Sequence, residues 1–231
     1  MKTRILPDAF AVSKAAASFI AAEARDSVAT RGRFVMAVSG GKTPWQMLRD
    51  LAGEEVPWQQ FHVVQVDERI APSGDPDRNL THLHESLLSS APIPPENIHA
   101  MPVENPDPIQ ACEDYTSTLD LLCGSPPILD LAHLGLGPDG HTASLIPGDP
   151  VCGVFDKEVA PTGLYQNRRR LTLTYPVINR SRRILWVVTG AEKAPMVPRM
   201  LSGDPSIPAG LIDRHNAVLL IDAPAAESIA D

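Results

Sequence analysis

The most constraining feature of this sequence is an alternation of short apolar, β-branched runs with segments of helical periodicity. Strands are predicted at residues 33–38, 61–66, 98–103, 128–137, 183–190 and 217–222. Helices are predicted between the earlier strands, at residues 8–30, 44–51, 79–88 and 108–122. This alternation is typical of an α/β fold, a mostly parallel open sheet with helices on both faces.

Two parts of the chain depart from this alternation. Residues 154–160 and 169–175 read as two strands joined by a polar loop, which predicts a small antiparallel excursion from the main sheet. A helix is expected after Gly190, but Pro195 and Pro198 weaken it, because a proline inside a helix costs about 3 kcal/mol. No Gly/Ser-rich or charge-dense linker interrupts the 231 residues, so we expect a single domain over 1–231.

Charge and cysteine content restrict the function classes. The formal net charge of −8 argues against binding of nucleic acid or an anionic membrane, so an anionic substrate needs a local basic pocket. Cys112, Cys123 and Cys152 are an odd, widely spaced set without a C-x-x-C pair, which indicates neither disulfides nor a zinc site. The Ala-rich start is interrupted by Lys14 and Glu23 and does not resemble a signal sequence. We therefore expect a cytoplasmic protein that does not span a membrane.

Three polar or glycine-rich turns each follow a predicted strand directly. They lie at residues 39–44, 67–69 and 135–144. In an open α/β sheet the carboxyl ends of the strands share one edge, and ligands bind there. The three turns are therefore predicted to meet in one pocket.

The first turn, SGGKTP, suits a phosphate group. Gly40 and Gly41 allow backbone N–H groups to approach an anion, and the helix that follows directs its positive dipole end toward it. The motif is not a Walker A loop, because that pattern requires glycine at Met36, inside the strand. A plain strand-to-helix turn is the alternative interpretation.

The other two turns contain candidate catalytic groups. His141 is the best candidate base among the seven histidines, because an imidazole can accept a proton from water near neutral pH. Asp139 is close enough in sequence to orient it, although a helix-capping histidine beside a structural aspartate is the alternative. Arg69 offers a guanidinium to a phosphate or an oxyanion, unless it only forms a salt bridge with Asp67 or Glu68.

Two other patterns do not indicate function. Residues 135–140 match the dinucleotide fingerprint G-x-G-x-x-G, but Pro147 and Pro150 prevent the helix that this fingerprint requires. His82 and His84 are two residues apart on a predicted helix and so lie on different faces, which argues against a metal pair.

Four segments together resemble the 6-phosphogluconolactonase family within the glucosamine-6-phosphate isomerase/6-phosphogluconolactonase superfamily. They are VSGGKTP, VDER, LGLGPDGHTASLIPG and RLTLTYPVINRSRRILWVVTGAEKA. The resemblance implies a sugar-phosphate isomerase-like fold and hydrolysis of 6-phosphogluconolactone to 6-phosphogluconate in the oxidative pentose phosphate pathway. It implies no metal or organic cofactor. The expected partner is the sugar-phosphate lactone alone, bound by a monomer or homodimer.

The resemblance also implies roles for individual residues. His141 matches the catalytic base of the family, and with Asp139 and Arg69 it forms the predicted catalytic set. The predicted substrate-binding residues are Ser39, Gly40, Gly41, Lys42, Thr43, Asp67, Gly137 and Lys193. The chain departs from the family pattern in two places, at residues 78–80, which read RNL, and at residues 208–210, which read PAG.

Hydrolysis of a δ-lactone requires a positioned water, a base and stabilisation of the tetrahedral oxyanion, which His141, Arg69 and backbone N–H groups could supply. A covalent route through Ser39 or Ser144 is less expected because no G-x-S-x-G elbow is present. One rival is a glucosamine-6-phosphate deaminase or isomerase, whose motif continues DGHIAFNEP where this chain reads DGHTASLIP. A second is a non-catalytic sugar-phosphate sensor, although no DNA-binding helix-turn-helix or basic face is visible.

Overall fold

The computed structural model describes residues 1–229, so the last two residues of the predicted domain lie outside the described part of the chain. Within it, a seven-stranded parallel sheet has the order β1-β10-β9-β6-β2-β3-β5. Its strands, in chain order, are β1 (Lys2–Leu6), β2 (Phe34–Val38), β3 (Phe61–Gln65), β5 (Ile98–His99), β6 (Leu131–Leu134), β9 (Ile184–Val188) and β10 (Ala217–Asp222). The predicted open parallel sheet is confirmed.

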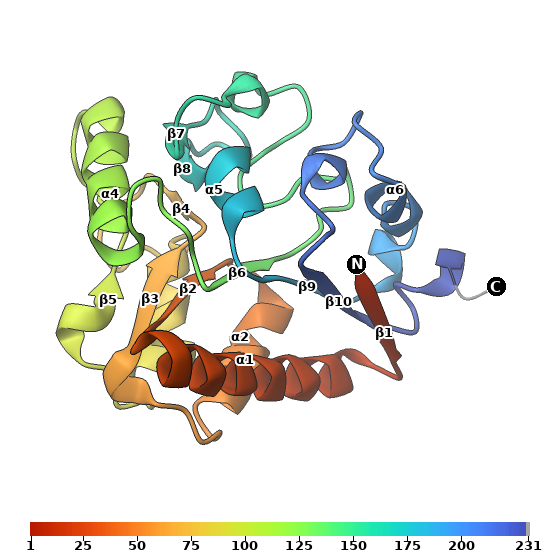
Figure 1. Ribbon diagram of the computed structural model, residues 1–231. Coiled ribbons are helices and arrows are strands. Elements are labelled where there is room, and N and C mark those ends of the chain that lie inside the picture. Colours follow the sequence, from red (N-terminus) through yellow and green to blue (C-terminus); the bar gives the residue numbers. More distant parts are fainter. Residues whose placement is uncertain (230–231) are drawn as a thin grey trace.

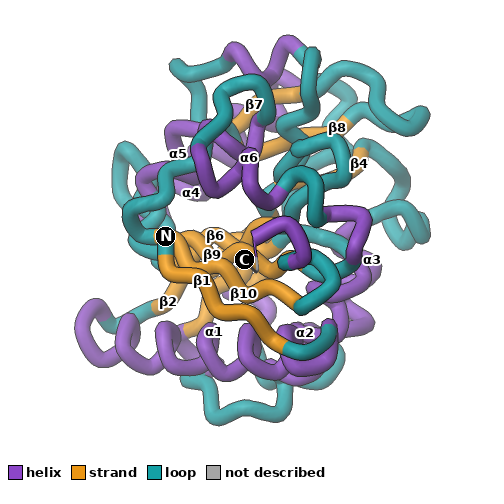
Figure 2. The backbone as a smooth tube through the Cα atoms, turned by 90° about the vertical axis from the view of Figure 1, so that its right-hand side faces the viewer, coloured by secondary structure: helices purple, strands orange, loops and turns teal. Residues whose placement is uncertain are grey.

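Helices cover both faces of this sheet. Figures 1 and 2 show α1 and α2 on one face, with α4, α5 and α6 on the other. The α-helices are α1 (Ala9–Arg31), α2 (Lys42–Leu51), α3 (Asn79–Leu83), α4 (Pro108–Cys123), α5 (Tyr175–Arg180) and α6 (Val197–Ser202). Short 3-10 helices lie at Trp58–Gln60, Pro95–Asn97, Pro150–Gly153, Ala191–Lys193, Pro208–Leu211 and Glu227–Ile229.

The strands separate two hydrophobic cores because successive side chains point to opposite faces. In β2, Phe34, Met36 and Val38 pack toward α1 and α2, whereas Val35 and Ala37 pack toward α4 and the opposite layer. All five residues of β2 are buried. A central strand covered on both faces needs a continuous apolar sequence, and FVMAV has this property.

Local sequence signals set the ends of the long helices. The Asp8 carboxylate accepts a hydrogen bond from the Ala11 N–H at the start of α1, and Gly32 ends the helix with φ 77°. Asp107 caps α4 in the same way. After Gly190, Pro195 and Pro198 do not abolish helical structure, because α6 begins at Val197 and places Pro198 in its first turn, where no N–H is needed.

A second, antiparallel sheet of order β4-β8-β7 lies on the α4 side of the main sheet. It contains β4 (Asp67–Arg69), β7 (Val159–Pro161) and β8 (Arg170–Leu173). The predicted antiparallel excursion is confirmed, and β4 joins it as a third strand. The chain passes between the sheets at Val66, whose N–H donates to the Val38 carbonyl while its own carbonyl accepts from the Leu173 N–H.

The structure differs from the predicted elements at several places. β1 was not predicted because it is an exposed edge strand with little apolar pattern. The strand predicted at 98–103 is paired only at 98–99, and the one predicted at 128–137 only at 131–134. The helix predicted at 79–88 is an α-helix over Asn79–Leu83 and a π-helix over His84–Leu88. A helix that was not predicted, α5, follows β8 at residues 175–180.

The strand order reverses direction between β2 and β6. From β2 the chain proceeds through β3 to β5 on one side, then returns to β6 and continues through β9 to β10 on the other. The loops that leave β2 and β6 therefore diverge, and this divergence opens a crevice at the carboxyl edge of the sheet.

Candidate active site

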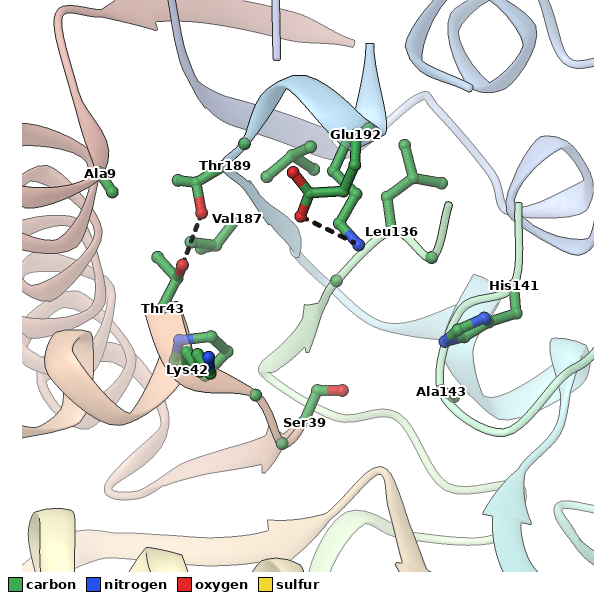
Figure 3. Close-up of a pocket in the computed structure, with 18 of the residues that line it drawn as sticks. Ala9, Ser39, Lys42, Thr43, Leu136, His141, Ala143, Val187, Thr189 and Glu192 are labelled. Atoms are coloured by element: carbon green, nitrogen blue, oxygen red, sulfur yellow. Dashed lines mark hydrogen bonds and ion pairs between the residues drawn. The ribbon is translucent and has the colours of Figure 1, made fainter. Parts of the chain in front are cut away.

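A cavity with a volume of about 620 Å³ lies in this crevice. The loops that follow β2, β6 and β9 contribute to it, together with residues of β4, the start of α3 and the last residue of β10. Figure 3 shows Lys42 and Thr43 on one side of the cavity, His141 on the other, and Ser39 between them. The lining residues are Ala9, Ser39, Gly40, Gly41, Lys42, Thr43, Pro44, Asp67, Arg69, Asn79, Gly135, Leu136, Gly137, His141, Ala143, Val187, Val188, Thr189, Gly190, Glu192, Lys193 and Asp222.

The glycine turn after β2 is closely packed. A Cβ at Gly40 would lie 2.1 Å from Oδ1 of Asn79, so only glycine fits there. Gly41 has φ 130°, in the region that favours glycine, and its carbonyl accepts from the Trp45 N–H as α2 begins. Thr43 Oγ1 lies 2.5 Å from Oγ1 of Thr189 and so links the turn to the loop after β9.

A buried histidine supports the same turn. Nδ1 of His133, in β6, accepts a hydrogen bond from the Ser39 N–H at 3.3 Å, and the side chain is fully buried. Burial lowers the pKa of His133 to about 3. The imidazole is therefore neutral at physiological pH and keeps the lone pair that the Ser39 N–H requires.

His141 is held by its own loop. Its Nδ1 lies 2.6 Å from Oδ1 of Asp139, which also accepts from the His141 backbone N–H at 3.1 Å. A carboxylate can only accept, so Nδ1 carries the proton and the lone pair of the neutral ring is on Nε2. The ring rests against Gly137, where a Cβ would lie 2.1 Å from Nδ1. Figure 3 shows the ring directed toward the cavity.

The Asp139 carboxylate has further support. Burial acts to raise the pKa of Asp139, but hydrogen bonds from the His141 backbone and ring, together with the charge of the ring, outweigh burial and lower the pKa. The Tyr165 hydroxyl donates to Oδ2 of Asp139 at 3.4 Å, and the Tyr165 ring meets the His141 ring edge to face at 5.9 Å. Asp139 does not itself line the cavity, and it acts there only through His141.

Arg69 forms no ion pair within residues 1–229, so neither salt bridge considered for it, to Asp67 or to Glu68, is present. Its Nη1 donates to the Asp77 carbonyl at 2.7 Å and to Oδ1 of Asn79 at 3.0 Å. Hydrogen bonds to neutral acceptors fix the guanidinium without neutralising it. Its charge therefore remains available to an anion in the cavity.

The fully buried Glu68 carboxylate organises this corner of the site. Oε1 accepts from the Arg69 and Asn79 N–H groups, and Oε2 accepts from the Leu80 N–H, all at 2.8 Å. The Arg78 Nε lies 3.6 Å from Oε2. Glu68 thus holds Arg69 and Asn79 together, and Arg78, one of the departures from the family pattern, compensates the buried charge.

Asp67 faces the cavity from a polar pocket. Its Oδ2 accepts from the Ser144 hydroxyl at 2.5 Å, and Asn79 donates to its Oδ1 at 3.4 Å. Ser144 is buried and does not line the cavity, whereas Ser39 does. Of the two serines considered for a covalent route, only Ser39 is placed to meet a ligand.

The loop after β9 supplies the remaining cation. Lys193 is in the cavity wall, with Nζ 3.7 Å from Oε1 of Glu192, and this contact is drawn in Figure 3. Gly190 has φ 98°, and its N–H donates to the buried Asp222 carboxylate at 3.1 Å. A hydrogen bond between the loops after β9 and β10 therefore fixes the start of the segment that carries Lys193.

The structure gathers the predicted site residues at one place. All of them line the cavity except Asp139, which lies behind His141. Sequence reasoning missed Asn79, Thr189, Gly190 and Asp222. Thr189, Gly190 and Asp222 stand at the ends of predicted strands, so the strand-end rule could have found them. Asn79 had no such signal.

The second departure from the family pattern also lies beside the site. The Ala209 N–H donates to the Gly140 carbonyl at 3.0 Å. A Cβ on Gly140 would lie 2.7 Å from Cβ of Ile207. The segment around 207–209 therefore packs on the turn that presents His141.

The residues that the structure describes contain neither a metal-ligand cluster nor a membrane-spanning helix. Between residues 1 and 229 there is no cluster of three or more His, Cys, Asp or Glu side chains placed to hold a metal ion. His82 packs against Trp45, and His84 is exposed. None of the helices in this part of the chain is both long enough and apolar enough to span a membrane.

Comparison with known proteins gave matches over most of the chain. The model of the family described as glucosamine-6-phosphate isomerases/6-phosphogluconolactonase matches residues 7–221. A 6-phosphogluconolactonase of Nostoc sp. is 32% identical, covering 98% of this chain and 97% of that protein, and one of Synechocystis sp. is 36% identical over 88% of each. The crystal structure of 6-phosphogluconolactonase from Thermotoga maritima has a TM-score of 0.86 at 27% identity, covering 96% of this chain and 98% of that one.

Proposed function

The chain belongs to the glucosamine-6-phosphate isomerase/6-phosphogluconolactonase family, and from this premise we propose that it hydrolyses 6-phosphogluconolactone to 6-phosphogluconate. The relatives named 6-phosphogluconolactonase, at 32% and 36% identity over 98% and 88% of the chain, support this assignment. The observation that carries it is the Asp139–His141 pair, which presents a base across one cavity from Lys42 and Thr43.

The cavity has two ends of different chemistry. Lys42, Thr43 and the start of α2 form an end suited to phosphate, and Lys193 in the same cavity wall adds a second cation. His141 lies across the cavity from Lys42 and Thr43. We place the substrate phosphate at the lysine end and the lactone carbonyl beside His141, so that phosphate binding positions the carbonyl for attack.

In the proposed reaction a water molecule attacks the lactone carbonyl carbon while Nε2 of His141 accepts one of its protons. The carbonyl oxygen becomes an oxyanion, for which Arg69 is the proposed donor. The tetrahedral intermediate then collapses. The bond to the ring oxygen breaks, and that oxygen leaves as a hydroxyl after taking the proton from His141.

Asp139 has a positioning role in this scheme. It fixes the tautomer with the lone pair on Nε2, and it stabilises the imidazolium that forms as the water is deprotonated. A correctly placed general base contributes about 10²- to 10⁴-fold in rate. A lactone is an activated ester, so base and oxyanion donors are sufficient machinery without a covalent intermediate.

The proposal extends to the pathway and the compartment of the enzyme. We place the reaction in the oxidative pentose phosphate pathway and the enzyme in the cytoplasm, working without a metal or organic cofactor as a monomer or homodimer. The free state of Cys112, Cys123 and Cys152 supports a reducing compartment.

The test is a direct assay of lactone hydrolysis, followed by acid release and corrected for spontaneous opening, with ammonia release from glucosamine 6-phosphate measured in parallel. We expect hydrolysis only. Substituting His141→Ala should lower kcat by about 10²- to 10⁴-fold while calorimetry still detects binding of 6-phosphogluconate. Ammonia release without hydrolysis would instead identify a deaminase, and binding without either reaction would identify a sensor.

A further inference from the structure

A second polar cavity lies at the opposite edge of the main sheet from the candidate active site. Its volume is about 270 Å³. It is bordered by the segments that enter β2, β6 and β9, so it lies at the amino ends of these strands. The lining residues are Arg31, Arg33, Val35, Leu122, Cys123, Ile128, Asp130 and Arg182.

Positive charge is in excess in this cavity. Asp130 is 7% exposed and is the one carboxylate in the lining. Its Oδ1 lies 2.9 Å from Nε of Arg31 and 3.5 Å from Nε of Arg182, and its Oδ2 accepts from the Val35 N–H at 2.9 Å. Three guanidinium groups against one carboxylate leave a net charge of 3 − 1 = +2 in a protein whose formal net charge is −8.

Arg33 is the cation without a partner. It forms no ion pair and no side-chain hydrogen bond with the residues the structure describes, although it lies beside the Arg31–Asp130 pair in the lining. The Arg33 charge nevertheless affects the pKa of two neighbouring residues, His62 and Cys123. Burial and then Arg33 lower the pKa of His62, and Arg33 with Arg182 opposes the rise in the pKa of Cys123 that burial causes.

Neighbouring acidic groups do not neutralise this excess. Asp120 lies close enough to influence Cys123, but it accepts a hydrogen bond from Ser125 and does not line the cavity. Glu23 is paired with Arg183. The local potential is therefore positive, and planar guanidinium groups are donors that phosphate and carboxylate groups prefer.

We propose that this cavity binds a small dianion, such as inorganic phosphate or the phosphate group of a small metabolite, at a site separate from the active site. The volume is below the roughly 300 Å³ at which pockets for drug-sized ligands begin, which favours a small anion. Arg33 precedes β2 and Ser39 follows it, so the two sites are about 20 Å apart along that strand. Both can be occupied at once.

Backbone amide NMR during titration with inorganic phosphate separates the two sites directly. We expect saturable shifts of the Val35, Cys123 and Arg182 amide signals, independent of the shifts at Gly40 and Gly41 that report on the active site. If the Val35, Cys123 and Arg182 signals of the wild-type protein showed no saturable shifts, the proposal would be overturned.

Charge-removing variants test which side chains are responsible. In Arg33→Gln/Arg182→Gln we expect binding at this cavity to weaken roughly tenfold or more, with lactone hydrolysis unchanged. Lys2→Gln/Arg4→Gln removes the same charge from the exposed edge strand β1 and should leave the titration unchanged. Arg33→Gln alone breaks no ion pair, so it provides a folded variant with weakened binding even if the double variant is destabilised. Equal binding by all variants would contradict the assignment.

Discussion

Gly137 gives the sharpest test of the proposed base, because the imidazole of His141 rests directly on its α-carbon. In Gly137→Ala the added Cβ would lie 2.1 Å from Nδ1, whereas ordinary contacts begin at 3.4 Å. The ring must therefore retreat by about 3.4 − 2.1 = 1.3 Å. Such a movement also breaks the 2.6 Å contact between Nδ1 and Asp139.

The size of the effect follows from this displacement. A misplacement of about 1 Å can cost 10²-fold in rate, and complete loss of a general base costs about 10²- to 10⁴-fold. We expect kcat of Gly137→Ala to fall by about 10²-fold. KM should change little, because Lys42 and Thr43, across the cavity from His141, and Lys193 are untouched.

The measurement is acid release from the lactone over a range of substrate concentrations, with thermal unfolding recorded for each variant. Gly135→Ala is the matched control, since it lies in the same loop and an added Cβ meets nothing within 4 Å. If Gly137→Ala kept the wild-type kcat, or lost only substrate affinity, His141 would not be the base in the position described.

Three further outcomes are expected. Lys193→Met should raise KM about tenfold with little change in kcat, measured by the same assay, because its charge is proposed to hold the remote phosphate. Asp139→Asn should lower kcat. Because folding lowers the pKa of Asp139, its carboxylate stabilises the folded protein above the unfolded-state pKa near 3.9, and this stabilisation is lost as the pH falls through the folded-state pKa. The difference in urea midpoint between the variant and the wild type should therefore vanish in acid. Glu68→Gln should lower the free energy of unfolding in urea by about 3–5 kcal/mol, because Arg78 loses its buried counter-ion and keeps only the exposed Glu104. Glu104→Gln, which removes that exposed partner, should cost less than about 1 kcal/mol, and equal losses would contradict this account.

Most strands and helices could be predicted from the pattern of apolar residues in the sequence. Central strands such as Phe34–Val38 are apolar along their whole length because both faces are covered, and this property is written in the local sequence. β1 could not be predicted in the same way. Four of its five residues are exposed, and it is a strand only because the edge of β10 provides a partner.

The candidate site was predictable where residues follow strands and unpredictable where they depend on contacts between distant segments. Gly40, Asp67 and Gly137 all stand beside strand ends, so topology alone brings them together. Asn79 reaches the cavity because a buried carboxylate eleven residues earlier, that of Glu68, accepts its N–H. A contact of this kind cannot be predicted from a local sequence pattern.

The passage of the chain from one sheet to the other at Val66 limits how this protein can change in length. One residue separates the last paired position of β3 from the first of β4. Side chains alternate along an extended backbone, so an inserted or deleted residue here would exchange the orientations of Asp67 and Glu68 while leaving both sheets able to form. A change in length at this junction would therefore turn Glu68 instead of Asp67 toward the cavity, whereas surface loops can change in length without this effect.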